Sequence, residues 1–173
     1  MTGWQVRAST EDDWRAYRSL RLEMLVDTPI AFLETVEQAR AHPDDYWRTR
    51  DGNRSETSRL FGAVDGDGSW LGTMGVFHPP GARNPLLVGV YVTPAFRGRD
   101  HRLTDALLTS AAEWAGERAD RLLLHVHEQN EPAIRYYRRH GFEPTGVTVP
   151  YPLQPGGLEV EMALPLTPGA PRL

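Results

Sequence analysis

The side chains best suited to chemistry lie in a short basic segment, RGRDHR, at residues 97–102. This segment contains three arginines and one histidine against a single acidic residue, Asp100. It stands between a strand pattern at residues 86–92 and a helix pattern that begins at Leu103. The N-terminus of a helix presents unpaired backbone N–H groups and the positive end of its dipole, so a basic turn at this point predicts an anion site. A pyrophosphate is the anion that suits the arrangement best.

Both flanking elements have clear patterns. Residues 86–92, LLVGVYV, are mostly apolar and β-branched, as in a strand, and Pro94 cannot extend a hydrogen-bond ladder. Small and apolar residues then recur at helical spacing and form one face, which comprises Leu103, Ala106, Leu107, Ser110, Ala111 and Trp114. The sequence therefore predicts a strand, the basic turn and an amphipathic helix in that order.

A second candidate region also has a strand pattern followed by a helix pattern. Residues 121–127, RLLLHVH, are typical of a buried strand, with His125 and His127 on one face. In the next segment, NEPAIRYYRRHGF at residues 130–142, Pro132 stands where a first helical turn tolerates it, and a glycine closes the pattern. We expect a helix here that carries two adjacent tyrosines, whose phenols can donate a proton.

These two regions resemble a known family. The segment VGVYVTPAFRGRDHRLTDALL, residues 88–108, resembles the cofactor-binding motif of the GNAT superfamily of acetyl-CoA-dependent N-acetyltransferases, in which an apolar strand precedes Gln/Arg-x-x-Gly-x-Gly/Ala at a helix start. Residues 130–142 resemble that family's Asn-x-x-Ala-x-x-x-Tyr-x-x-x-Gly-Phe segment. The two motifs stand in the family's order and cover roughly the C-terminal half of the chain.

The resemblance implies a fold of the α/β (α+β) class. In this GNAT-like fold, a central, mixed, mostly antiparallel twisted sheet of about six to seven strands is flanked by helices and splayed at its two central strands. Residues 1–164 are expected to form a single GNAT-type N-acetyltransferase domain, with a loose C-terminal tail at residues 165–173. The chain length suits one domain of ordinary size.

The resemblance also implies acetyl-CoA as co-substrate. Backbone groups at residues 90–92 would pair with the pantetheine arm, and the N–H of Val92 would stabilise the developing oxyanion. Asn130 matches the family residue that binds the cofactor near the thioester, and it could also cap the helix. The expected cofactor-binding residues are Val90, Tyr91, Val92, Arg97, Gly98, Arg99, Asp100, His101, Arg102, Leu103 and Asn130.

The resemblance assigns a direct attack of an amine on the thioester, which needs a base and an acid. Tyr137 fills the family's Tyr position and is the expected acid, in preference to Tyr136. Residues 86–92 contain no carboxylate, so the base is His125 or, alternatively, Glu34 on the helix expected at residues 30–40. His125 could equally be a satisfied structural histidine. No third ligand follows the His-x-His pair at a recognisable spacing, so no metal is expected.

Two positions depart from the family pattern and leave two hypotheses. Asp100 and Arg102 stand where the motif has small residues that let the backbone approach phosphate. The first hypothesis is an acyltransferase that moves acetyl from acetyl-CoA to a primary amine of a small molecule, peptide or protein. The alternative is a GNAT-fold protein with weakened or lost turnover that acts as a ligand-binding or interaction module.

The remaining patterns complete the sheet and its covering helices. Ser9 and Thr10 precede three acidic residues and predict a helix start, and Trp14 begins the buried face of that helix. A shorter helix is expected from Pro43 to Trp47. Further strands are expected at residues 4–7, 60–64, 70–77, 147–149 and 158–164.

Composition excludes several classes of protein. The formal net charge of −4 argues against nucleic acid as a partner. The chain has no cysteine, and all 19 basic residues are arginine, so thiolate and lysine nucleophiles are excluded. The N-terminus lacks a signal-like apolar region and no apolar run is long enough to cross a membrane. We expect a cytoplasmic enzyme whose partners are acetyl-CoA and an amine acceptor, with homodimerisation left open.

Overall fold

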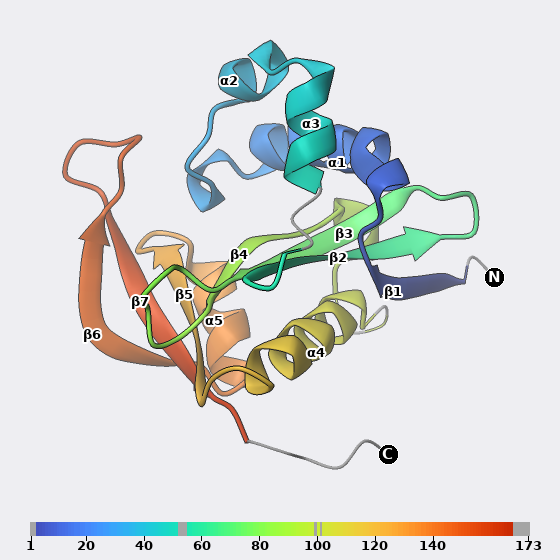
Figure 1. Cartoon of the computed structure of the whole chain (residues 1–173). Coiled ribbons are helices and arrows are strands. Elements are labelled where there is room, and N and C mark those ends of the chain that lie inside the picture. Colours follow the sequence, from blue (N-terminus) through green and yellow to red (C-terminus); the bar gives the residue numbers. More distant parts are fainter. Residues whose placement is uncertain (1–2, 52–54, 99, 101, 168–173) are drawn as a thin grey trace.

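A single sheet of seven strands forms the centre of the molecule (Figure 1). The computed structural model describes residues 3–51, 55–98, 100 and 102–167. The strands are β1 (Trp4–Ala8), β2 (Ser58–Asp65), β3 (Trp70–Phe77), β4 (Leu86–Val92), β5 (Arg121–His127), β6 (Glu143–Pro150) and β7 (Leu158–Pro165). Their order is β1-β2-β3-β4-β5-β7-β6, and every neighbouring pair is antiparallel except β4 and β5. The expected mixed, mostly antiparallel sheet is confirmed.

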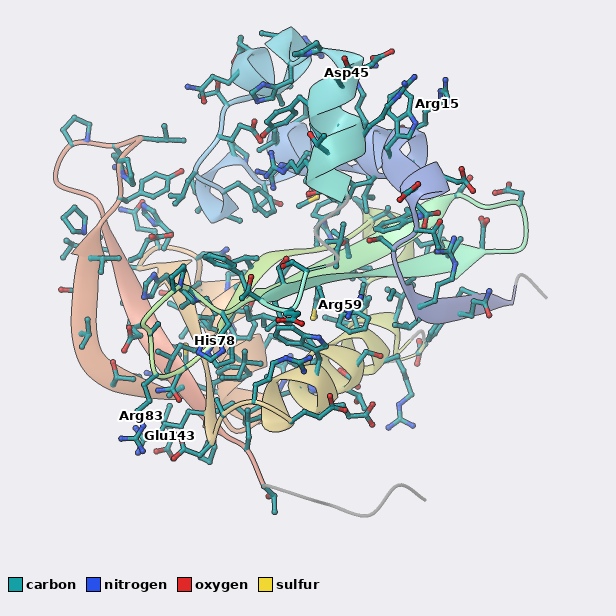
Figure 2. The ribbon with its side chains drawn as sticks, viewed as in Figure 1. Arg15, Asp45, Arg59, His78, Arg83 and Glu143 are labelled. Carbon is teal, nitrogen blue, oxygen red and sulfur yellow. The ribbon has the colours of Figure 1, made fainter. Side chains whose placement is uncertain are left out.

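Helices cover both faces of this sheet because each face is apolar and must be buried. One layer comprises α1 (Trp14–Asp27), α2 (Val36–Ala41) and α3 (Asp44–Asp51), with the short 3-10 helices η1 (Glu11–Asp13) and η2 (Pro29–Ala31). The opposite layer comprises α4 (Leu103–Gly116) and α5 (Glu131–Arg139). Each layer encloses its own apolar cluster against the sheet. Arg15 and Asp45 lie on the outer surface of the first layer (Figure 2).

The two central strands separate along their length. Strands β4 and β5 pair only where Leu86 and Leu87, at the start of β4, lie beside Leu123 and Leu124 in the middle of β5. Further along β4, its register with β3 shifts, and Gly89 adopts a positive φ of 59°. Such an irregularity bends a strand away from its neighbour. The splay expected between the central strands is therefore confirmed, and it opens a gap at their C-terminal ends.

One expected helix is divided. Residues 30–40 were predicted as one helix, but η2 ends at Ala31 and α2 begins only at Val36. The Thr35 hydroxyl accepts from the Gln38 N–H, and Gln38 binds back to the Thr35 N–H, so a capping box fixes the start of α2. Glu34 consequently lies in a bend and not on a helix.

Other boundaries differ by a few residues. The expected strand at residues 147–149 is longer, because β6 pairs with β7 from Glu143 onwards. After β7 ends, the Leu166 N–H still donates to the Asp120 carbonyl oxygen at 2.8 Å. Residues 168–173 of the expected tail lie outside the described residues. Among the described helices, none has the length and apolar character needed to span a membrane.

Candidate active site

A cavity of about 780 Å³ lies where β4 and β5 separate. Side chains from both helical layers line it, including Arg21 of α1 and Tyr136 of α5. Among the predicted site residues, the lining includes Val90, Tyr91, Val92, Arg97, Gly98, His125, Asn130 and Tyr137. Four predicted residues that the structure describes are not in the lining, namely Glu34, Asp100, Arg102 and Leu103. The predicted Arg99 and His101 lie outside the described residues.

The basic turn reaches the cavity through its backbone. Gly98 has a φ of 106°, which glycine adopts at little cost, and a Cβ there would meet no other atom within 4 Å. Arg102 is exposed and left-handed, with a φ of 50°, at the N-cap of α4. Leu103 is fully buried and anchors the helix start. The turn therefore places the N-terminus of α4 beside the gap, as the anion-site prediction requires.

Arg97 has intramolecular partners on two elements. Its Nε donates to the Val92 carbonyl oxygen at 2.8 Å, and its Nη2 donates to the Asp27 carboxylate at the end of α1. The Arg97 guanidinium also lies 5.3 Å from the Tyr91 ring centroid. The hydrogen bond from Arg97 lowers the pKa of Asp27. Arg97 thus joins the turn to α1, which sequence patterns gave no means to predict.

Tyr137 is a buried phenol that faces the cavity. Among the described residues, its hydroxyl has no hydrogen-bond partner. Burial raises the pKa of Tyr137, so the phenol keeps its proton at neutral pH. Tyr136 also lines the cavity, but its hydroxyl donates to Asp105 at 3.1 Å and its ring stacks on His140. Of the two adjacent tyrosines of α5, Tyr137 is thus the one whose hydroxyl has no partner among the described residues.

Asn130 fits both interpretations drawn from the sequence. Its Oδ1 accepts from the Ala133 N–H at 3.4 Å, so the side chain caps α5. The residue also lines the cavity next to Pro132 and Ala133. Because the cap uses Oδ1, the amide nitrogen of Asn130 makes no hydrogen bond within the described residues.

The two histidines of β5 differ in their surroundings. His127 is almost fully buried; its Nδ1 accepts from the Gln129 N–H at 3.1 Å and its Nε2 donates to Gln154 at 3.2 Å. Both ring nitrogens are thus occupied, which makes His127 structural. His125 is partly exposed, and its Nε2 lies 3.1 Å from a carboxylate oxygen of Glu161 on β7.

Glu159 is a cavity residue that sequence reasoning missed. It lies directly opposite His127 in the β5–β7 pairing, is only 8% exposed and lines the cavity. Burial raises the pKa of the Glu159 carboxyl, and the nearby His125 and His127 only partly oppose this rise. A buried carboxylate with a raised pKa is suited to accept a proton. The available signal was the alternation of β7, LEVEMALP, which puts two glutamates on one face.

Glu34, the alternative base from the sequence, is hydrogen-bonded to two arginines and one histidine. Its carboxylate accepts from Arg21 at 2.9 Å, His42 at 2.8 Å and Arg50 at 3.4 Å. Burial tends to raise the pKa of Glu34, but the hydrogen bonds from Arg21 and His42 outweigh it and the pKa is lowered. Glu34 lines a separate pocket of about 460 Å³ together with Tyr151. A carboxylate held in this way is a weak proton acceptor.

Comparison with known proteins identifies the family. A profile of the acetyltransferase (GNAT) family matches residues 14–142. The chain belongs to this family. Over 154 residues this GNAT protein is 27% identical to the L-amino acid N-acetyltransferase AaaT of Escherichia coli (strain K12), covering 87% of this chain and 90% of the relative.

Solved structures of GNAT proteins share the fold. A GCN5-related N-acetyltransferase from Kribbella flavida has a TM-score of 0.67 and 28% identity, covering 94% of this chain and 98% of that one. The yncA structure from Salmonella typhimurium, which contains its cofactor acetyl-CoA, has a TM-score of 0.76 at 18% identity, covering 99% and 98%. At 18% identity, the similarity to the yncA structure shows a shared fold only.

Family membership decides between the two hypotheses from the sequence. The protein is an N-acetyltransferase with acetyl-CoA as co-substrate, and the interaction-module alternative is not favoured. The site suits this co-substrate: among the described strand residues, β4 has no backbone pair in β5 beyond Leu87, which leaves an edge for an extended pantetheine arm. The N-terminus of α4 beside Gly98 suits the pyrophosphate.

Proposed function

We propose that the protein acetylates the primary amine of a small molecule bound in the cavity between the two helical layers. One observation carries the proposal: the same cavity contains the free edge of β4, the Tyr137 phenol and the buried Glu159 carboxylate. Its volume of about 780 Å³ lies in the range of small-molecule sites. The acceptor enters from the side of α1, because residues of α1 and η2 line that part.

In this proposal the residues divide the proton chemistry between them. Acetyl-CoA supplies an activated acetyl thioester. Glu159 attracts the acceptor ammonium and takes its proton, so that a neutral amine attacks the thioester carbonyl. As the new C–N bond forms and the C–S bond breaks, Tyr137 gives its proton to the departing sulfur. The N–H of Val92 remains the proposed donor to the developing oxyanion, and Asn130 the proposed partner of the cofactor near the thioester.

This proposal gives Glu159 the role that the sequence offered to His125 or Glu34. Support comes from burial and position: Glu159 lines the cavity, and its carboxylate makes no side-chain hydrogen bond or ion pair within the described residues. Glu34, in contrast, has a lowered pKa and accepts hydrogen bonds from Arg21, Arg50 and His42. His125 is not assigned the role of base, because its Nε2 lies 3.1 Å from the Glu161 carboxylate.

The test is calorimetric titration with acetyl-CoA, followed by measurement of thiol release with a panel of acceptors. Micromolar binding, about −8 kcal/mol, is expected for acetyl-CoA. The panel contains small primary amines, peptides and an intact protein. The small amines include L-amino acids, because the E. coli relative is named an L-amino acid N-acetyltransferase. Turnover of small amines supports the proposal. Turnover confined to peptide or protein amines, or no turnover while acetyl-CoA binds, would overturn it.

A further inference from the structure

Two buried arginines face the acceptor side of the cavity. Arg21 of α1 is 6% exposed and Arg50 of α3 is partly buried, and both line the cavity. They share one carboxylate, Glu34, at 2.9 Å from Arg21 and 3.4 Å from Arg50. This cluster, Arg21, Arg50, Glu34 and His42, was not expected from the sequence.

The charges of this cluster do not cancel. Guanidinium groups stay protonated at all accessible pH values, so Arg21 and Arg50 contribute two positive charges. Glu34 contributes one negative charge, and His42 can only add a positive one. Within the described residues, the cluster thus keeps at least one unbalanced positive charge next to the cavity. A partly buried charge without a counter-charge is costly, so the site favours an anion.

The geometry leaves donors for that anion. The hydrogen bonds to Glu34 use Nε and Nη2 of Arg21 and Nη1 of Arg50, which also donates to the Tyr46 hydroxyl. Among the described residues, Nη1 of Arg21 and Nε and Nη2 of Arg50 make no hydrogen bond. Glu34 lines the smaller pocket, so it holds the guanidinium groups from one side while they line the main cavity. Planar guanidinium groups with free N–H groups match a carboxylate.

A continuous set of contacts connects this cluster to Glu159. The Arg21 guanidinium lies over the Phe32 ring, at 5.1 Å from its centroid. The Phe32 carbonyl oxygen accepts from the Tyr151 hydroxyl at 3.0 Å, and the Tyr151 ring meets the His127 ring edge-on at 4.7 Å. His127 pairs with Glu159 across β5 and β7. Arg21, Arg50 and Glu159 all line the main cavity, so this cavity contains both cationic and anionic side chains.

We infer that Arg21 and Arg50 bind a carboxylate of the acceptor, so that the acceptor is an amino carboxylic acid. The inference rests on the proposed function, because Glu159 then receives the ammonium group of the same molecule. Opposite charges at its two ends orient the acceptor and present its amine to the thioester. An amine without a carboxylate would leave the positive cluster unbalanced and would bind weakly.

Matched acceptors test this inference. Thiol release is measured with L-α-amino acids, β-alanine and γ-aminobutyrate, each beside its amide and its decarboxylated amine. Within the set that the enzyme acetylates best, the acid is expected to have a kcat/KM at least tenfold higher than its amide and its decarboxylated amine. Equal kcat/KM values for acids, amides and amines would overturn the inference but leave the proposed function intact.

Two variants on one helix localise the effect. Arg50→Gln is expected to raise KM for the acids tenfold or more without raising KM for amines that lack a carboxylate. Arg48→Gln is the matched control, because Arg48 is exposed on the same helix and lies over Trp14. Thermal unfolding of both variants checks their folding. An equal loss for acids and neutral amines in Arg50→Gln would contradict a carboxylate subsite.

A binding measurement keeps the inference testable without turnover. In calorimetry with CoA present, the preferred acid is expected to bind the wild-type protein at least tenfold more tightly than its amide. Selective acid binding that Arg50→Gln abolishes supports the subsite even if every acetylation assay fails. Failure of the acids to bind, or equal binding of acid and amide, would overturn it.

Discussion

Asp27 at the end of α1 forms an ion pair with Arg97, which stands 70 residues further along the chain in the turn before α4. Because Arg97 also donates to the Val92 carbonyl oxygen, one side chain joins α1, the end of β4 and the basic turn before α4. The Asp27–Arg97 pair thus connects α1, which lines one part of the cavity, to the turn before α4, which lines another.

Asp27→Ala is expected to weaken acetyl-CoA binding several-fold, because Arg97 loses the partner that orients the turn. The loss in free energy of unfolding should stay below about 1 kcal/mol, as for other partly exposed ion pairs. Calorimetric titration with acetyl-CoA measures the affinity. Asp120→Ala is the control, since it removes an exposed pair with Arg83 far from the α1–α3 layer (Figure 2). Equal affinities in the two variants would show that the Asp27–Arg97 pair does not position the turn.

Tyr137→Phe should lower kcat by roughly 10²- to 10⁴-fold, which is the usual effect of losing a general acid. The acetyl-CoA affinity should stay unchanged, since only the hydroxyl is removed. Tyr136→Phe is the matched control: it loses the bond to Asp105, with a stability cost of about 1 kcal/mol, and should keep kcat. Steady-state kinetics and calorimetry separate the two effects. A kcat that falls in Tyr136→Phe and not in Tyr137→Phe would reverse the assignment.

Glu159→Gln is expected to abolish most activity and to remove the acidic limb of the kcat/KM profile. Wild-type kcat/KM should fall as the pH drops through the raised pKa of Glu159, because the protonated carboxyl cannot accept a proton. Glu161→Gln, on the same strand and hydrogen-bonded to His125, should keep this limb. If the limb survives in Glu159→Gln and moves in Glu161→Gln, the proton acceptor is His125.

Glu159→Gln should also change the free energy of unfolding. A raised pKa in the folded state means that the Glu159 contribution to stability is present below the unfolded pKa and is lost as the pH rises through the folded pKa. Glu159→Gln should therefore be more stable than the wild type at neutral pH, by on the order of 1 kcal/mol, with a smaller difference at acidic pH. Urea unfolding at both pH values measures it. A destabilised variant at neutral pH would contradict the cost assigned to the buried carboxylate.

Arg102→Gly should stabilise the protein by up to about 1 kcal/mol, because Arg102 has a left-handed φ of 50° that glycine adopts more readily. Arg102→Ala is the control, since alanine retains the left-handed penalty. Urea unfolding compares the three proteins. A gain in both variants would point to the loss of the exposed guanidinium group and not to relief of the backbone.

Local patterns in the sequence were sufficient for the elements that carry the site. The predicted strands at residues 86–92 and 121–127 agree with β4 and β5, because a short apolar run is a pattern of neighbouring residues that the sequence shows directly. Tyr137 and Asn130, which the second motif singled out, both line the cavity. The helix expected at residues 30–40 was wrong in extent, since the capping box at Thr35 competes with helix continuation.

Only the tertiary structure decided which charges meet. Glu34 is separated from Arg21 and Arg50 by 13 and 16 residues, and Glu159 reaches the cavity through the pairing of β7 with β5. Such long-range contacts decide whether a carboxylate is neutralised by arginines, as Glu34 is, or buried with a raised pKa, as Glu159 is. A sequence gives the residue type and its local conformation, whereas the pKa depends on the solvent and charges that folding brings to it.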